Sequence, residues 1–278
     1  MNVKDISVIF LLYNTRPDLF KNLKNYKNFK VLVLDQSDDL LFKKKIKNFF
    51  PRLSYYSSKK GNKGFASGIN FLVKKVKTKY FLCTQPDIFI NEKSILKLKK
   101  TINNKKKNCV VAVPRVSNYK NYIKSDKKIH LVENIIGAVF LSEKKKFQKL
   151  KMFDENFFFY WEDVDLCNRI HNSNYQILIN HSAYALHTWT STKFDFKTLF
   201  IKSSNFKFGE YLYQYKNNKL KNIKIVRQIL INSLSGVFYL FIFNQKEFLK
   251  RIFYICGIFK FLKFLILSKK SNLLAKLT

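Results

Sequence analysis

The sequence predicts an α/β protein with a doubly wound sheet, followed by a helical C-terminal region. Three observations predict it. The first 116 of the 278 residues alternate short apolar segments with helical ones, as the strands and crossover helices of a parallel sheet do. The pattern becomes mixed after residue 116. From about residue 195 onward it is helical.

The strands expected in the first half are four to seven residues long and bounded by turn or polar residues, which is typical of buried parallel strands. They are residues 6–12, 31–35, 53–56, 80–84 and 110–116. The helices expected between them are residues 17–27, 39–49, 65–77 and 92–104, with Asn91 or Ser94 as the cap of the last.

For the second half of the chain, the sequence predicts both strands and helices, and the strands are expected to extend the same sheet. Strands are expected at residues 129–132 and 135–141, with one or two more within 175–186. Helices are expected at residues 143–150 and 162–172.

Three C-terminal helices are expected at residues 197–215, 225–243 and 247–267, and the last two are very apolar. Polar residues interrupt both, so neither is a clean span of about 20 uncharged apolar residues. Aromatic helices punctuated by lysine in so basic a chain are typical of a membrane interface. The alternative is a buried helical hairpin.

Composition sets limits on function. Apolar residues make up 47% of the chain, so a disordered protein is excluded, and the net charge of +35 favours anionic partners. The lysines are spread along the chain, so a merely solvated basic surface is an equal alternative. The four cysteines are far apart in sequence, which indicates buried free thiols in a reducing compartment. No signal peptide is evident, and a cytoplasmic location is expected.

Polar residues follow three of the expected strands: Tyr13-Asn14, Asp35 and Gln85-Pro86-Asp87. Ligands of open α/β sheets bind beyond the carboxyl ends of the strands, so these residues predict a site. Taken singly, Asp35 could instead cap a helix and Asp87 could belong to a turn.

Three of the chain's seven glycines fall within eight residues, in the run from Gly61 through Asn62 and Gly64 to Gly68. This run precedes a helix, where backbone N–H groups can approach an anion. It matches neither the dinucleotide fingerprint nor the Walker loop. A tight turn is the alternative.

Five of the eighteen acids lie within twelve residues: Asp154, Glu155, Glu162, Asp163 and Asp165. The aromatic run 157–161 lies among them, and a carboxylate walled by rings can have its pKa raised, as a general base requires. A capping box beside an aromatic core patch is the alternative.

His187 follows the last expected strand. If that strand returns His187 to the edge where Asp87 lies, the two side chains could hold a divalent ion. A lone histidine is more often an ordinary core or surface residue.

Taken together, these residues resemble the family-2 glycosyltransferases of the GT-A fold, especially rhamnosyltransferase-like bacterial members. The resemblance runs from about residue 6 to about residue 190. Gly61–Asn70 is similar to the family's Asn-x-Gly-Phe-Ala motif, and Gln85-Pro86-Asp87 occupies the place of its metal motif. Phe153-Asp154-Glu155 with Phe158–Asp165 is similar to the Phe-Asp-Glu and Trp-Glu-Asp-x-Asp segment.

The resemblance implies an inverting glycosyltransferase. Asp163 would be the catalytic base, with Glu162 and Asp165 positioning the base or the acceptor. Mg²⁺ or Mn²⁺ would be held by Asp87 and His187. The donor, a nucleoside diphosphate sugar, would contact Tyr13, Asn14, Asp35, Gly61, Asn62, Gly64, Gln85 and Asp87. The acceptor side would be formed by Gly137, Ala138 and Trp161.

Two positions depart from the family pattern. The metal motif has Gln85 where its first acid is expected, which weakens the expected metal affinity. Lys151-Met152 stands where Gly-Gly usually precedes Phe-Asp-Glu, which affects the expected acceptor loop.

The resemblance divides the chain into a catalytic domain at 1–194 and a helical region at 195–278. Within the catalytic domain, 1–116 is the nucleotide-sugar half and 117–194 the acceptor half. The expected donor is dTDP-rhamnose or a UDP-sugar. The expected acceptor is a saccharide or polyprenyl-diphosphate-linked molecule in cell-surface polysaccharide synthesis, at the inner face of the cytoplasmic membrane.

Two other classes remain open. A basic nucleic-acid-binding protein is compatible with the charge, but no recognition motif appears, and we expect no nucleic-acid partner. A nucleotidyltransferase on a related α/β sheet would need a glycine-rich basic loop after the first strand, and residues 13–17 do not form one.

Overall fold

A computed structural model describes residues 3–14, 18–37, 39–59, 61–104, 108–117, 128–188 and 195–274. Residue 17, where the first helix is predicted to begin, and the predicted boundaries at 190 and 194 lie outside these ranges. The chain forms two compact units. The sheet unit comprises residues 1–156 and 162–190, and the helical unit comprises residues 157–161 and 191–278.

The described part of the sheet unit has nine strands, in the order β3-β2-β1-β4-β8-β6-β9-β5 with β7 on β9. The four strands at one side are parallel, whereas β8 is antiparallel to both β4 and β6, so the sheet is mixed. The strands are β1 (Ile6–Leu12), β2 (Lys30–Asp35), β3 (Ser54–Ser57), β4 (Tyr80–Thr84), β5 (Ile88–Ile90), β6 (Cys109–Val116), β7 (Ile129–Leu131), β8 (Phe140–Glu143) and β9 (Gln176–His187).

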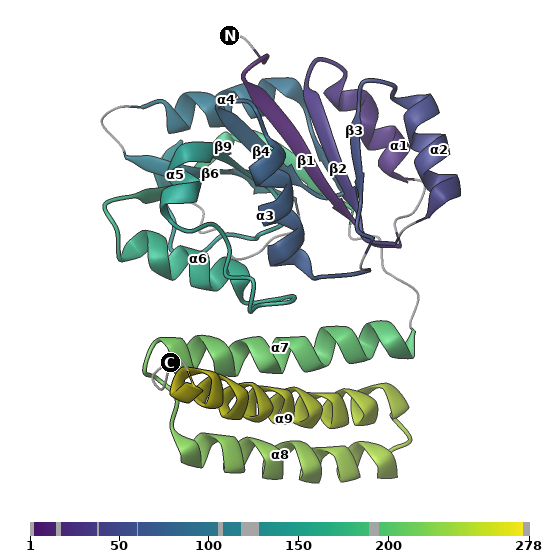
Figure 1. The fold of residues 1–278 in the computed structure, drawn as a ribbon, viewed down its shortest axis with the longest axis vertical. Coiled ribbons are helices and arrows are strands. Elements are labelled where there is room, and N and C mark those ends of the chain that lie inside the picture. The colour runs from purple at the N-terminus through teal and green to yellow at the C-terminus, as the bar shows by residue number, and fades with distance from the viewer. Residues whose placement is uncertain are drawn as a thin grey trace. The chain divides into compact units, whose positions relative to one another are not determined.

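Helices flank this sheet, as Figure 1 shows. They are α1 (Asp18–Leu23) with the 3-10 turn η1 (Lys24–Tyr26), α2 (Leu40–Phe49), α3 (Phe65–Lys75), α4 (Glu92–Ile102), α5 (Lys144–Lys149) and α6 (Glu162–His171). Asn91 is the cap of α4, because its side chain accepts a hydrogen bond from the Ser94 N–H. The predicted mixed α/β sheet is therefore confirmed.

Two sequence expectations differ from the structure. The strand predicted at 135–141 begins only at Phe140, because residues 137 and 138 form a turn. The three-residue strand β5 was not predicted, since it is too short to show an alternating pattern. It pairs with β9, so the chain after β4 runs directly into a second strand.

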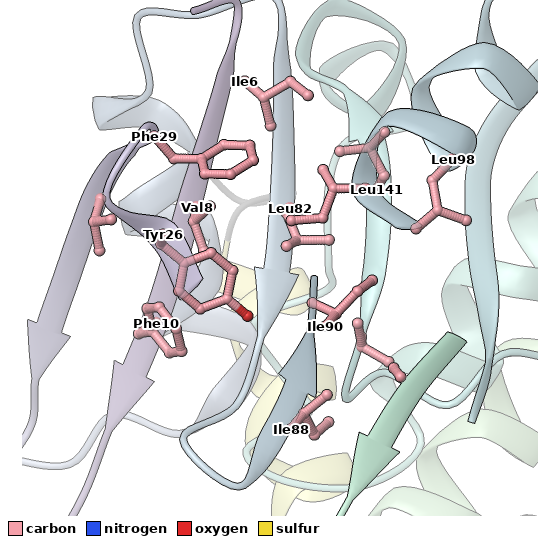
Figure 2. Close-up of a cluster of buried hydrophobic side chains, with 14 of the residues drawn as sticks. Ile6, Val8, Phe10, Tyr26, Phe29, Leu82, Ile88, Ile90, Leu98 and Leu141 are labelled. Carbon is pink, nitrogen blue, oxygen red and sulfur yellow. The ribbon is translucent and has the colours of Figure 1, made fainter. Parts of the chain in front are cut away.

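The core beneath the strand ends is formed by β1, β4 and β5. Figure 2 shows Phe10, Tyr26, Leu82, Ile88 and Ile90 gathered in one buried cluster. Burying each such side chain contributes about 1.5–3 kcal/mol. This packing fixes β5, and with it the turn that follows β4.

The described part of the helical unit contains three long helices, α7 (Phe196–Lys216), α8 (Asn222–Phe241) and α9 (Gln245–Leu274). Figure 1 shows α9 between α7 and α8. Its core includes Phe208 and Tyr211 of α7 with Ile258 and Phe261 of α9. Gly257 allows α9 to approach α7 closely, because a Cβ there would meet the Ser204 carbonyl oxygen at 2.3 Å. The predicted C-terminal helical region is thus present.

Candidate active site

The ends of β1 and β2 lie side by side, because Leu12 pairs with Asp35. The buried Asp35 carboxylate accepts hydrogen bonds from the Ser37 N–H at 2.9 Å and the Tyr55 hydroxyl at 2.7 Å. The Asn14 N–H donates to Ser37 Oγ at 2.6 Å, and Asn14 has a φ of 49°. Asp35 therefore organises the strand ends and does not cap a helix.

The glycine-rich loop is fastened to the end of β2 by Gln36. This buried side chain accepts from the Lys63 N–H at 2.7 Å and donates to the Gly64 carbonyl at 3.3 Å. The Gly64 N–H also donates to Asn62 Oδ1 at 2.9 Å. Gly61 and Gly64 have φ values of 70° and 87°, which explains why glycine stands at both positions. The donor residues predicted at 13, 14, 35, 61, 62 and 64 therefore belong to one connected set of loops.

At Gly68, the third position of this run, glycine is required for close packing and not for a positive φ. A Cβ on it would lie 2.5 Å from Leu11 Cδ1, so its absence lets α3 pack closely on β1.

Asp87 and His187 lie together, as the sequence hypothesis required. Ile88 pairs with His187 across β5 and β9, and His187 Nε2 lies 3.2 Å from Asp87 Oδ2. The Thr188 N–H donates to the Asp87 carbonyl at 3.0 Å. One carboxylate and one imidazole suit a divalent cation such as Mn²⁺. Within the described ranges no three such ligand side chains gather, so this pair would leave the other coordination positions to a ligand and water.

A buried asparagine in α1 holds the turn that carries Gln85 and Asp87. Asn22 is fully buried, and its Nδ2 donates to the Ile88 carbonyl at 2.6 Å and to the Pro86 carbonyl at 3.1 Å. Gln85 is partly buried, and its carbonyl accepts from the Ile88 N–H at 3.1 Å. Sequence reasoning missed Asn22. The available signal was a polar residue between the apolar positions of a helix.

Glu162 and Asp163 begin α6, and Asp163 reaches back to the preceding strand connection. Its Oδ2 accepts from the Gly137 N–H at 3.1 Å and its Oδ1 from the Val164 N–H at 2.9 Å. Burial raises the pKa of Asp163, against the opposing effect of these two hydrogen bonds. Burial, reinforced by the charge of Asp163, also raises the pKa of Glu162.

Glu162 is the more enclosed of the two acids, at 5% exposure, while Asp163 is partly exposed. Oε2 of Glu162 is buried and has no hydrogen-bond partner among the described residues. Two neighbouring carboxyls with raised pKa values are a pattern of functional sites.

Asp165 acts through Arg169. Its buried carboxylate accepts from Arg169 Nε at 2.8 Å, and the same guanidinium donates to the carbonyls of Leu150 and Met152. Lys151 and Met152 have φ values of 62° and 56°, in the left-handed region that favours glycine. This turn therefore keeps a glycine-like conformation without glycine, and Arg169 holds it.

The segment after that turn is tied to α3 by Asn70. This buried side chain donates to the Phe153 carbonyl at 2.8 Å and to Glu155 Oε1 at 3.0 Å, and it accepts from the Phe153 N–H at 3.1 Å. Asn70 closes the glycine-rich run in the sequence, but sequence reasoning gave it no role.

The three residues assigned to the acceptor side have different surroundings. Gly137 faces Asp163, and a Cβ on it would lie 3.3 Å from the Asp163 Cβ. Ala138 is buried in the core of the sheet unit, so only its backbone can face a ligand. Trp161 belongs to the helical unit, where its ring centroid lies 5.9 Å from that of Phe206 and 5.5 Å from that of Tyr213.

Residues 7–169, more than half of the chain, match the family model "Glycosyl transferase family 2". No curated protein sequence matches this chain. A structure of GalNAc-T7 with UDP, GalNAc and Mn²⁺ is similar over 75% of this chain and 48% of that one, with a TM-score of 0.60 and 12% identity. This chain therefore spans about half the length of that protein.

Two further structures match most of both chains. One is the mannosyltransferase PcManGT from Pyrobaculum calidifontis in complex with GDP-Man and Mn²⁺. The match covers 93% of this chain and 87% of that one, with a TM-score of 0.57 and 10% identity. The other is a structure of residues 1–349 of TarS from S. aureus. The match covers 92% of this chain and 91% of that one, with a TM-score of 0.52 and 14% identity. At these identities the likeness extends to the fold alone.

Proposed function

Since the chain belongs to glycosyl transferase family 2 and has the GT-A fold, we propose that it is an inverting enzyme in which Asp163 is the catalytic base. The carboxylate of Asp163 at the start of α6, fixed by the Gly137 N–H and enclosed beside Glu162, is the observation that carries this proposal. The donor is a nucleoside diphosphate sugar that lies across the ends of β1, β2 and β4.

The protein's own groups supply the steps of transfer. Asp163 takes the proton from the acceptor hydroxyl, whose oxygen attacks the anomeric carbon on the face opposite the diphosphate. The bond from that carbon to the diphosphate oxygen breaks as the new glycosidic bond forms, so the configuration inverts. A raised pKa suits Asp163 to this role, because a base works best when its pKa lies near the working pH.

The loops at the strand ends bind and orient the donor in this proposal. Asp35 and the Asn14 backbone lie at the nucleotide end, and the Gly61–Gly64 loop, held by Gln36, presents its backbone nearby. Asp87 and His187 would hold Mg²⁺ or Mn²⁺. The bound cation would neutralise negative charge on the leaving diphosphate.

Glu162 and Asp165 position the base or the acceptor, each in a different way. Glu162 lies beside Asp163 and shares its enclosed environment, while Asp165 fixes the turn at Lys151-Met152 through Arg169. Gly137 and the Ala138 backbone are assigned to the acceptor, and Trp161 of the helical unit is a separate candidate for acceptor contact. The acceptor is a saccharide or a polyprenyl-diphosphate-linked molecule of cell-surface polysaccharide synthesis, reached at the cytoplasmic face of the membrane. The donor sugar is rhamnose from dTDP-rhamnose, or the sugar of a UDP donor.

A thermal-shift screen of UDP, GDP, dTDP, CDP and ADP, each with and without Mn²⁺, tests donor binding. One of these nucleoside diphosphates should raise the melting temperature of the full chain, and the rise should be larger with Mn²⁺. Asp35→Ala should remove that rise. The matched control Asp39→Ala changes an exposed helix cap and should leave the ligand-induced shift intact. Equal shifts for wild type and Asp35→Ala would contradict the assignment of Asp35.

The stereochemical part of the proposal has its own test. NMR of freshly formed product reports the anomeric configuration directly. Inversion relative to the donor sugar is expected, and retention would overturn the single-displacement mechanism.

A further inference from the structure

Helix α8 has one covered face and one open face. Ile225, Asn232 and Gly236 are buried, and a Cβ on Gly236 would lie 3.6 Å from the Arg251 Cβ of α9. The opposite face carries large apolar side chains that are each 51% to 76% exposed: Ile223, Val226, Leu230, Leu234, Val237, Phe238 and Phe241. Their spacing of three or four residues makes one continuous strip, named here the α8 strip. Contiguous apolar surface of this kind marks an interaction site.

Helix α8 and the segments that flank it in sequence carry only basic charges. No Asp or Glu occurs between Tyr211 and Lys246. An open pocket of about 340 Å³ at the N-terminal end of α8 is lined by Lys219, Lys221, Ile223, Lys224, Arg227 and Gln228. Lys224 lies 3.8 Å from Glu210, whereas Lys219, Lys221 and Arg227 form no ion pair with any described residue. Three free cations therefore adjoin the apolar strip.

The apolar α8 strip and the adjoining basic pocket together favour one kind of binding partner over the others. A second copy meeting this face would bring its own cations against these, and the nearby acid Glu210 is already paired with Lys207 and Lys224. By length and composition α8 is the one helix in the described chain that could cross a membrane. Its buried face, however, includes Asn232 and packs on α9, so only one side of α8 is free for lipid. An anionic lipid surface matches both the apolar strip and the positive pocket.

We propose that α8 binds an anionic phospholipid membrane while lying in the plane of the interface. The α8 strip enters the boundary between headgroups and acyl chains. Lys219, Lys221 and Arg227 contact lipid phosphates at the N-terminal end. Helix α8, and not α9, makes this membrane contact, independently of the transfer reaction.

Co-sedimentation of the full chain with vesicles tests the proposal. The wild type should bind vesicles of phosphatidylcholine with about 30 mol% phosphatidylglycerol, whose negative surface potential attracts basic residues, and bind pure phosphatidylcholine far less. Lys219→Gln, Lys221→Gln and Arg227→Gln together should weaken binding on the order of 100-fold, because each cation near the surface contributes about fivefold. Leu230→Gln, Leu234→Gln and Phe238→Gln together should also abolish sedimentation.

The matched control places the same three substitutions on exposed apolar residues of α9, as Phe259→Gln, Ile266→Gln and Leu267→Gln, which are 55%, 67% and 56% exposed. This control should bind as the wild type does, and circular dichroism should show native helix content in every variant. Equal losses for the α8 and α9 variants would overturn the proposal. So would a concentration-dependent dimer, seen by light scattering, that the α8 substitutions dissociate without any vesicle binding by the wild type.

Depth of insertion separates an in-plane helix from a spanning one. A tryptophan introduced as Leu234→Trp should be quenched by lipids brominated near the headgroup end of the acyl chain, and Phe259→Trp should not be. Alkaline carbonate should release the full chain from cell membranes. Retention after that wash, or quenching only by deeply brominated lipids, would contradict the in-plane arrangement.

Discussion

The backbone N–H of Gly137 donates to Oδ2 of Asp163 across 3.1 Å, and Gly137 offers no Cβ to obstruct it. The two residues are far apart in sequence, on a turn before β8 and at the start of α6. This contact fixes the direction of the carboxylate while leaving Asp163 partly exposed. The proposed base thus has a defined position in the folded chain.

Gly137→Ala should lower the transfer rate with little effect on donor binding. The added Cβ would lie 3.3 Å from the Asp163 Cβ and 3.4 Å from its Oδ2, so the carboxylate has to move by a few tenths of an ångström. A displacement of about 1 Å can cost 100-fold in rate, so a loss of about 10-fold is expected. Steady-state kinetics and donor titration measure the two quantities, and unchanged kcat would show that the contact has no catalytic importance.

Glu162→Gln should stabilise the fold near neutral pH. Because burial raises the pKa of Glu162, the unfolded chain ionises at a lower pH than the folded chain. The folded state therefore loses stability as pH rises from the ordinary carboxyl pKa toward the raised one, and glutamine removes that loss. The variant should gain about 1 kcal/mol or more at pH 8, since one unit of pKa shift is about 1.4 kcal/mol.

At about pH 3, well below the ordinary glutamic acid pKa of about 4.3, the side chain is protonated in both states and the stability difference should vanish. Urea unfolding at the two pH values measures it, and the exposed Glu133→Gln serves as the control. A gain of equal size at both pH values would have a cause other than the buried charge.

His187→Ala should weaken donor binding only when Mn²⁺ is present. His187 and Asp87 form the pair assigned to the metal, so loss of one ligand should reduce Mn²⁺ affinity on the order of 10-fold. Calorimetric titration of the donor at several Mn²⁺ concentrations measures the effect. The control is His171→Ala, an exposed histidine at the end of α6. Identical Mn²⁺ curves for wild type and His187→Ala would remove His187 from the metal site.

Asn70→Ala should destabilise the sheet unit. The buried amide of Asn70 pairs with both the N–H and the carbonyl of Phe153, and alanine would leave both groups without that partner. Each buried unpaired group costs about 1–3 kcal/mol, so a loss of about 2–4 kcal/mol in unfolding free energy is expected. Urea denaturation checks this, with the exposed Asn156→Ala as the comparison. Equal small losses in both variants would contradict a structural role for Asn70.

The sequence was sufficient for the elements whose periodic pattern is long. The strand at 80–84 and the helices near 65–77 and 162–172 appear close to their predicted bounds, because apolar spacing determines which face is buried. The α/β fold and the resemblance to family-2 glycosyltransferases were confirmed. The position of β8 between β4 and β6 could not be predicted from the sequence, because strand pairing joins residues that are far apart along the chain.

The positions of some candidate-site residues could also be predicted, while their roles stay predictions. The approach of His187 to Asp87 followed from the hypothesis that the last strand returns to that edge. Gln36, Asn22 and Asn70 were missed for a shared reason. Each bonds to backbone groups 27 to 83 residues away, and such partners leave no local signature in the sequence.

Replacement of Asp163 by asparagine tests the central claim most directly. The amide keeps the size of the side chain and can still accept from the Gly137 N–H, but it cannot take a proton. Transfer by Asp163→Asn should fall by about 10²–10⁴-fold while calorimetric donor affinity stays at the wild-type value. Transfer within a few-fold of the wild type, with the same donor affinity, would contradict the assignment of Asp163 as the base.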